Sequence, residues 1–214
     1  MQLVKRTYSG MMHAIAGLGA LEKLSDDART SDAYRWQRWT ASLLAIHDID
    51  RMVALDLPWW NVAATREAED YLRARPGARV FEYGAGASTI WLARRAGSVM
   101  SVEHHADWHR RLEPMVARFA NIELWQRDLT GDAYIGAIDE AGGLFDMIVV
   151  DGRRRAECLA RAVPHLKPGG VILFDDSGRR RYRHAIETCG LPEQRHFGRS
   201  YCVPYPDFTS FLRG

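Results

Sequence analysis

Cysteine is scarce in this sequence of 214 residues, which contains only three. Cys158, Cys189 and Cys202 lie far apart and form no Cys-x-x-Cys pair. An odd number of cysteines at such spacing argues against a disulfide framework and against a zinc site. We therefore expect reduced thiols in a cytoplasmic protein.

Long apolar runs are missing too. No uncharged stretch approaches the length of about 18 residues that a membrane-spanning helix needs. Residues 11–21 follow Lys5 and Arg6 and are mildly apolar, but His13, alanines and glycines interrupt them and no cleavage site follows. This pattern is not typical of a signal peptide.

Neither sign of charge dominates the chain. There are 29 Lys and Arg residues against 27 Asp and Glu residues, so the formal net charge is only +2. A general nucleic-acid partner is therefore not expected, nor is a membrane. The hydrophobic share of 47% and the charged share of 26% exclude a disordered chain. We expect a small-molecule partner, and the sequence is compatible with a homodimer.

Helical spacing dominates residues 10–60. Apolar residues recur every three or four positions across 11–18 and again across 36–53, with a polar break at 25–32. Leu57-Pro58 ends the second helix, because proline disfavours helix for the residue before it. These patterns predict a helical extension over residues 1–60, followed by a further helix at 63–73.

From residue 78 onward, short β-rich runs alternate with helical patterns, which predicts βαβ units and a parallel sheet. Ser88 is expected to cap the first helix after the sheet begins. The fold class is therefore α/β, with a doubly wound, seven-stranded, mostly parallel sheet over 61–214. Ligands bind such sheets at the carboxyl ends of the strands. The predicted strands are 79–82, 98–103, 122–125, 147–150, 171–174, 193–197 and 207–212, and the helices 89–95, 108–119, 155–166 and 182–189.

The first predicted strand leads into a glycine turn, Glu82-Tyr83-Gly84-Ala85-Gly86-Ala87-Ser88-Thr89. Glycines let the backbone approach a ligand, and the helix that follows offers unpaired N–H groups. A site for NAD needs the pattern G-x-G-x-x-G, but Thr89 stands at the third glycine. The carboxylate of Glu82 suits a ligand with a cationic end and repels a pyrophosphate, so an NAD-dependent oxidoreductase is the weaker alternative.

Other marks follow in order along the chain. Glu103 ends the second strand, Asp128 follows the third, residues 145–152 read FDMIVVDG, and residues 166–170 read LKPGG. Together with the glycine turn, these segments resemble the class I S-adenosylmethionine-dependent methyltransferases over about residues 60–214.

The resemblance implies a Rossmann-like fold and S-adenosylmethionine as the cofactor. In that superfamily the glycine turn holds the methionine portion, the acid after the second strand binds the ribose hydroxyls, and the acid after the third lies near the adenine amine. The residues expected at the cofactor on this basis are Glu82, Tyr83, Gly84, Ala85, Gly86, Ser88, Thr89, Glu103, His104, Asp128, Leu129, Asp151 and Trp60.

Trp59 and Trp60 precede the sheet domain. N-terminal helices often cover the cofactor in the superfamily, so a tryptophan here could stack on adenine or form a wall of the acceptor site. Core packing is the other interpretation. We expect one of the two in each role, with Trp60 assigned to the cofactor.

Three carboxylates, Asp151, Asp175 and Asp176, follow the fourth and fifth strands, which should be neighbours. Such a group could hold Mg²⁺ or Ca²⁺ through oxygen ligands. The arrangement resembles the metal-dependent catechol and caffeoyl-CoA O-methyltransferases, although an Asp-Asn pair follows strand five there. The other interpretation is a set of ion pairs with nearby arginines, and we expect no metal.

Arginines gather after the same two strands, at 153–155, 179–181 and 183. Arginines in such runs often lie at the solvent-exposed start of a helix, where nearby acidic side chains neutralise their charge. Seven arginines beside the predicted site of a nearly neutral protein nevertheless favour an anionic acceptor. Arg153 and Arg179 are the residues predicted to bind it.

These observations predict methyl transfer from S-adenosylmethionine to an oxygen or nitrogen nucleophile of a small, anionic acceptor. Asp151 is the candidate base. Enzymes that methylate amino groups of nucleic acids carry the signature N/D-PP-Y/F at this place. Residues 151–154 read DGRR instead, which argues against a DNA-base methyltransferase. The alternatives are a non-catalytic module that binds the cofactor or a partner, and an NAD-dependent oxidoreductase.

Overall fold

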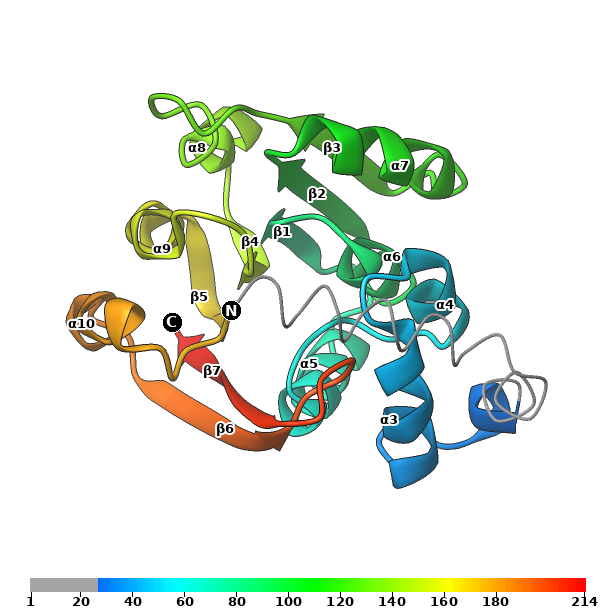
Figure 1. Cartoon of the computed structure of the whole chain (residues 1–214). Coiled ribbons are helices and arrows are strands. Elements are labelled where there is room, and N and C mark those ends of the chain that lie inside the picture. The colour runs from blue at the N-terminus through cyan, green and yellow to red at the C-terminus, as the bar shows by residue number, and fades with distance from the viewer. Residues whose placement is uncertain (1–26) are drawn as a thin grey trace.

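A seven-stranded sheet forms the centre of the protein (Figure 1). The computed structural model describes residues 27–214. The strand order is β3-β2-β1-β4-β5-β7-β6, and β7 alone runs antiparallel to its neighbours. The fold is therefore the doubly wound, mostly parallel sheet that the sequence predicts. The strands are β1 (Arg79–Tyr83), β2 (Ser98–Glu103), β3 (Ile122–Gln126), β4 (Phe145–Val150), β5 (Leu166–Asp175), β6 (Glu193–Arg199) and β7 (Pro206–Arg213).

Helices cover both faces of this sheet. In Figure 1, α8, α9 and α10 lie on one side, and α5, α6 and α7 lie on the other. The helices of the sheet domain are α5 (Val62–Arg73), α6 (Ala87–Ala93), α7 (Ala106–Val116), α8 (Ala137–Ala141), α9 (Arg155–Ala162) and α10 (Arg180–Thr188), with a short 3₁₀ turn, η2 (Val163–His165), after α9.

The central strands are mostly apolar because both of their faces are buried. Successive side chains of a strand point to opposite faces. Phe81 of β1 and Ile148 of β4 therefore pack in one core with α8, α9 and α10. Val80 and Met147, their neighbours along the same strands, pack in the other core with α5 and α6.

The direction in which successive strands are added to the sheet reverses between β1 and β4. The loops that follow these two strands therefore lead to opposite sides of the sheet. Gly84 after β1 has a φ of +95°, and a Cβ on it would lie 2.6 Å from the Cα of Gly152, which follows β4. Both loops therefore need glycine to pass each other. Parallel sheets bind their ligands at this switch point.

The N-terminal helices differ from the prediction in one respect. The helix expected over 36–53 is divided into α3 (Trp36–Ser42), η1 (Leu43–Ala45) and α4 (Ile49–Ala54). The break lies at His47, whose φ is +58°, and the Asp48 side chain accepts a hydrogen bond from the Arg51 N–H to cap α4. A capping aspartate competes with continuous helix. The helical pattern over residues 11–18 lies outside the described residues.

The described part of the extension docks on the connection between β6 and β7. The indole of Trp39 donates to the Ser200 carbonyl at 2.9 Å, and the Tyr201 hydroxyl donates to the Ala33 carbonyl at 2.8 Å. The N–H of Cys202 donates to the hydroxyl of Ser42. Segments about 160 residues apart in sequence thus contact each other and form one wall over the edge of the sheet. The domain boundary at residue 60 stays a prediction.

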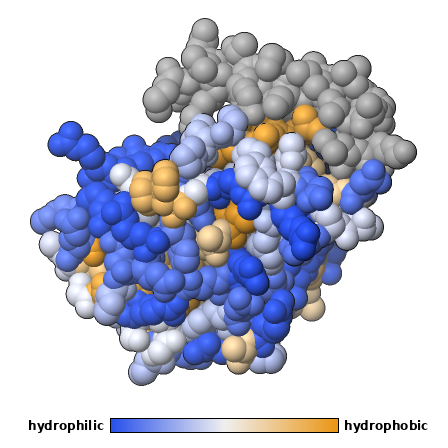
Figure 2. Space-filling model, turned by 90° about the horizontal axis from the view of Figure 1, so that it is seen from below, coloured by the Kyte–Doolittle hydropathy of each residue, from blue (hydrophilic) through white to orange (hydrophobic). Residues whose placement is uncertain are grey.

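The face of the molecule in Figure 2 is mostly polar. On the face in Figure 2, hydrophobic residues show only in small separate areas among the hydrophilic ones. Among residues 27–214, no helix has the length and apolar character needed to cross a bilayer.

Candidate active site

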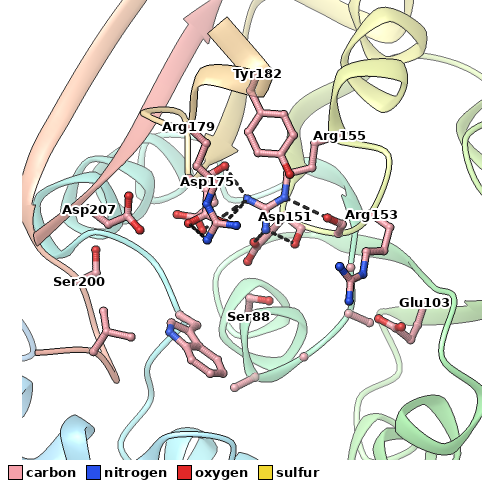
Figure 3. A pocket seen from close by; sticks show the side chains of 18 of the residues that line it. Ser88, Glu103, Asp151, Arg153, Arg155, Asp175, Arg179, Tyr182, Ser200 and Asp207 are labelled. Atoms are coloured by element: carbon pink, nitrogen blue, oxygen red, sulfur yellow. Dashed lines mark hydrogen bonds and ion pairs between the residues drawn. The ribbon is translucent and has the colours of Figure 1, made fainter. Parts of the chain in front are cut away.

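A cavity of about 850 Å³ opens at the carboxyl ends of the strands. The loops after β1, β2, β4 and β5 line it, together with residues in and next to α4, from the β6–β7 connection and from the start of β7. In Figure 3, Glu103 lies on one side and Asp207 on the other. We call these two sides the Glu103 end and the Asp207 end. Between them lie Asp151, Asp175 and Arg155.

Glu82 lies beneath the glycine turn and is fully buried. The hydroxyls of Ser88, Thr89 and Ser101 donate to its carboxylate at 2.5, 2.5 and 2.6 Å. Burial raises the pKa of Glu82 to about 7, although these hydrogen bonds oppose the shift. Glu82 therefore supports the turn from below and does not line the cavity.

The turn itself lines the cavity with Gly84, Ala85, Gly86 and Ser88. α6 begins at Ala87, and the Gly86 N–H donates to the Thr89 hydroxyl at 3.0 Å. Gly86 is thus the residue before the first helical position, and the expected cap at Ser88 is wrong. The Ser88 hydroxyl is engaged by the buried carboxylate below the turn instead.

Glu103 ends β2 and lines the cavity. Its Oε1 accepts hydrogen bonds from the N–H groups of His104 and His105, at 2.9 and 2.7 Å, so the side chain is held in place. Of the two histidines, His104 lines the cavity. Burial lowers the pKa of His104, because desolvation disfavours its charged form.

The two tryptophans lie in different surroundings. Trp59 lines the cavity and makes an edge contact with His47 at 4.8 Å between ring centroids. Trp60, which was assigned to the cofactor, is fully buried against Trp91. Its indole N–H donates to Asp151 at 3.1 Å. Trp60 therefore acts on the cavity through Asp151 and does not face it.

Four more of the expected cofactor residues lie away from the cavity wall. Tyr83 and Thr89 are fully buried, and the Tyr83 hydroxyl donates to the Ile135 carbonyl at 2.7 Å. Asp128 is exposed and accepts from the Thr130 N–H, and Leu129 next to it is half-buried. The side chains of Tyr83 and Thr89 support the turn, while Asp128 and Leu129 lie in the loop after β3.

Asp151, Asp175 and Asp176, the carboxylate cluster, converge on Arg155. The guanidinium lies 2.8 Å from Asp151, 3.1 Å from Asp176 and 3.6 Å from Asp175. Burial raises the pKa of Asp151 to about 6 and that of Asp175 well above its ordinary value. Among the described residues, no group of side chains is arranged to hold a metal ion. The cluster does not fit a divalent ion as it stands, because Arg155 occupies its centre.

Three of the other six arginines in these runs are paired with acids as well. Arg154 binds Glu157 at 2.7 Å and Arg183 binds Glu193 at 2.7 Å. Arg179 binds Asp176 at 2.6 Å, yet 42% of its side chain stays exposed and it lines the cavity.

Arg153 lies at the Glu103 end, and Arg179 lies nearer the Asp207 end (Figure 3). The two arginines predicted to bind one acceptor are therefore separated by the carboxylate cluster.

Sequence analysis missed most of the Asp207 end. Ser200 and Tyr205 come from the β6–β7 connection, Asp207 comes from the start of β7, and Tyr182 comes from α10. The alternation of polar and apolar residues in this part of the sequence does not show that the loop folds back over the sheet. The only local signal was the proline-rich run at 203–206 between two predicted strands.

Known proteins share this fold and its sequence marks. A family model described as a methyltransferase domain matches residues 81–177, which run from β1 through the end of β5. A methyltransferase-like protein from Silicibacter pomeroyi is 25% identical, with a TM-score of 0.51 over 69% of this chain and 84% of that chain. No curated protein matches the sequence.

Two further solved structures resemble the fold at lower identity. A putative O-methyltransferase from Klebsiella pneumoniae is 16% identical, with a TM-score of 0.59 over 98% of each chain. A putative methyltransferase from Streptococcus mutans, solved in complex with S-adenosylhomocysteine, is 11% identical, with a TM-score of 0.51 over 70% of this chain and 97% of that chain.

The fold and site thus define the class of protein. The family match includes the glycine turn, Glu103 and the loop after β4 that carries Asp151. Residues 81–177 match a methyltransferase domain, and the fold is the Rossmann-like fold of the class I S-adenosylmethionine-dependent methyltransferases. A methyltransferase domain implies the use of S-adenosylmethionine.

Proposed function

We propose that this protein transfers a methyl group from S-adenosylmethionine to an oxygen or nitrogen atom of a small molecule. The observation that carries the proposal is one cavity with a glycine turn and Glu103 at one end and a separate polar end at Asp207. The first end suits the cofactor and the second suits the acceptor. A cavity of about 850 Å³ is large enough for both ligands.

Glu103 is the proposed ribose-binding residue. Its Oε1 accepts hydrogen bonds from two backbone N–H groups. These bonds leave Oε2, as far as the described residues show, to accept hydrogen bonds from the ribose hydroxyls. The backbone of Gly84 and Gly86 approaches the methionine portion, and Trp59 with Met52 forms an apolar wall on the other side.

The cofactor supplies an activated methyl group, so the protein mainly aligns the acceptor with it. Asp151 is the proposed base for a hydroxyl acceptor. It lies between the two ends, and Trp60 and Arg155 hold its two carboxylate oxygens. A carboxylate fixed in this way can take the acceptor proton without having to reorient.

The acceptor is proposed to carry a polar or anionic group next to Arg179 and Arg181. Both line the cavity, and Arg179 keeps exposed surface for a ligand despite its bond to Asp176. A planar guanidinium suits carboxylate or phosphate. Arg153 belongs instead to the cofactor side of the cavity.

An assay of methyl transfer tests this function. The protein is incubated with S-adenosylmethionine and a panel of small phenols, amines and carboxylated alcohols, and the release of S-adenosylhomocysteine is measured. We expect turnover with at least one acceptor, and less turnover in Arg179→Ala. A chain that binds the cofactor but methylates no member of a broad panel would favour the non-catalytic binding module.

An oxidoreductase that uses NAD is disfavoured by the same geometry. Thr89 replaces the third glycine, and its hydroxyl donates to the buried Glu82 carboxylate below the helix start. That carboxylate opposes a pyrophosphate at the same helix end. A thermal-shift comparison should show stabilisation by S-adenosylhomocysteine and none by NAD.

A further inference from the structure

Arg155 has an unusual environment for a charged side chain. It opens α9, and only 10% of its side chain is exposed. Its guanidinium donates to three backbone carbonyls, those of Asp151, Gly152 and Asp175, at 2.8, 2.9 and 2.5 Å. Arg155 thus binds the backbone at the ends of both β4 and β5.

The same guanidinium faces the whole carboxylate cluster. Asp151, Asp175 and Asp176 lie within 3.6 Å of it, and their side chains are 18%, 15% and 11% exposed. Two neutral hydrogen-bond donors also contact these carboxylates: the Trp60 indole donates to Asp151, and the Thr209 hydroxyl donates to Asp175. Buried carboxylates need such a counter-charge, because removing one partner leaves an uncompensated charge.

We propose that Arg155 is a built-in cation that takes the place of a divalent metal ion in this cluster. Three carboxylates from two adjacent strand ends are a typical ligand set for Mg²⁺ or Mn²⁺, which would need their oxygens within about 2.0–2.6 Å. The guanidinium draws the same oxygens around itself at hydrogen-bond distance. Arg155 is therefore a positioning residue that holds the cluster at the cavity wall.

This arrangement contains a latent metal site. Without the Arg155 guanidinium, the three carboxylates would lose the one cation that they share, and Arg179 would remain paired with Asp176 alone. Arg155→Ala should therefore gain affinity for Mn²⁺ that the wild-type protein lacks. The inference does not depend on methyl transfer, because cation binding is measured without cofactor or acceptor.

The experiment measures Mn²⁺ binding by electron paramagnetic resonance, together with thermal unfolding with and without Mn²⁺. We expect no Mn²⁺ bound to the wild-type cluster and no shift in its Tm. Arg155→Ala should unfold at a lower temperature, bind one Mn²⁺ per chain at least ten-fold more tightly than the wild-type protein, and recover part of the lost Tm. Arg155→Gln, which keeps more of the side-chain bulk, should show the same gain.

Two variants provide matched controls. Arg154→Ala removes the neighbouring guanidinium, which binds Glu157, and should gain no Mn²⁺ affinity. Arg155→Ala combined with Asp175→Asn should lose the gain. The proposal is overturned if the wild-type protein binds Mn²⁺ and Asp175→Asn abolishes that binding. It is equally overturned if neither Arg155 variant, prepared with Mn²⁺ present, binds the ion.

Discussion

Glu82 is a buried carboxyl group whose protonation is coupled to folding. Its pKa is about 7 in the folded protein and about 4.3 in an unfolded chain. Between these values the native state holds a proton that the unfolded state has released. The free energy of unfolding therefore falls as pH rises through this window, by on the order of 3 kcal/mol from this group.

Glu82→Gln should remove that part of the pH dependence. We expect a smaller loss of stability between pH 5 and pH 8 than in the wild-type protein, measured by urea denaturation at several pH values. Glu123→Gln, at an exposed position of β3, is the control and should behave as wild type. Equal slopes for Glu82→Gln and wild type would show that the carboxyl group does not titrate in this window.

Asp151 is the second titrating group with a functional consequence. Burial raises its pKa to about 6, and a base must be ionised to accept a proton. Turnover of a hydroxyl acceptor should therefore fall as pH drops below about 6. Asp151→Asn should lower kcat by roughly 10²-fold or more, with little change in affinity for S-adenosylhomocysteine.

The control for this prediction is Glu123→Gln, at an exposed position of β3 outside the cavity. It should keep the wild-type pH profile. A pH profile of Asp151→Asn that keeps both the wild-type rate and its acid limb would exclude Asp151 as the base.

Single residues were the hardest feature to predict from sequence. The marks at Gly84, Glu103 and Asp151 could be assigned because each follows a strand, and the end of a strand fixes where the next residues lie. Trp59 and Trp60 could not be distinguished, since adjacent residues differ only in the direction they face. The same applies to Arg153 and Arg155, which lie two positions apart but point to different surroundings.

At the scale of elements, the strands and most helices could be predicted because burial determines their pattern. Runs such as 147–150 are apolar throughout only in a strand that is covered on both faces. The short α8 could not be predicted, because five residues carry too little periodicity. The break at His47 was missed, because apolar spacing continues across it while a capping aspartate ends the helix.

The crossing of the loops after β1 and β4 gives an element-scale prediction. Gly84→Ala should destabilise the fold by more than about 1 kcal/mol, because it adds an unfavourable φ and a Cβ only 2.6 Å from the Gly152 backbone. Affinity for S-adenosylhomocysteine should fall as well. Urea denaturation and calorimetry measure the two effects.

Gly131→Ala is the matched control, because Gly131 also has a positive φ, +62°, but open space where its Cβ would lie. It should show only the smaller cost of the backbone conformation. An equal loss of stability in both variants would mean that the close approach of the two loops contributes nothing.

At the scale of the whole molecule, the cavity is built from both ends of the described chain. Its wall joins the region of α3 and α4 to the β6–β7 connection, through bonds such as that from Trp39 to Ser200. Hydrophobic periodicity predicts each of these elements but not their contact, because contacts over about 160 residues leave no local signal. The Asp207 end could therefore be found only in the folded structure.

Methyl transfer should not require a metal ion, because Arg155 provides the positive charge at the carboxylate cluster. Activity measured after extensive treatment with EDTA should equal that of the untreated protein. A loss of activity that Mg²⁺ restores would contradict this expectation and make Asp151, Asp175 and Asp176 ligands.

The central claim is that the glycine turn and Glu103 bind the cofactor, and calorimetry with S-adenosylhomocysteine tests it most directly. We expect one molecule to bind per chain with micromolar affinity. Glu103→Ala should weaken binding by about 1–3 kcal/mol, because a hydrogen bond to a charged group is lost. Glu123→Ala should leave it unchanged. The absence of binding to the wild-type protein, or equal affinity in Glu103→Ala, would contradict the account.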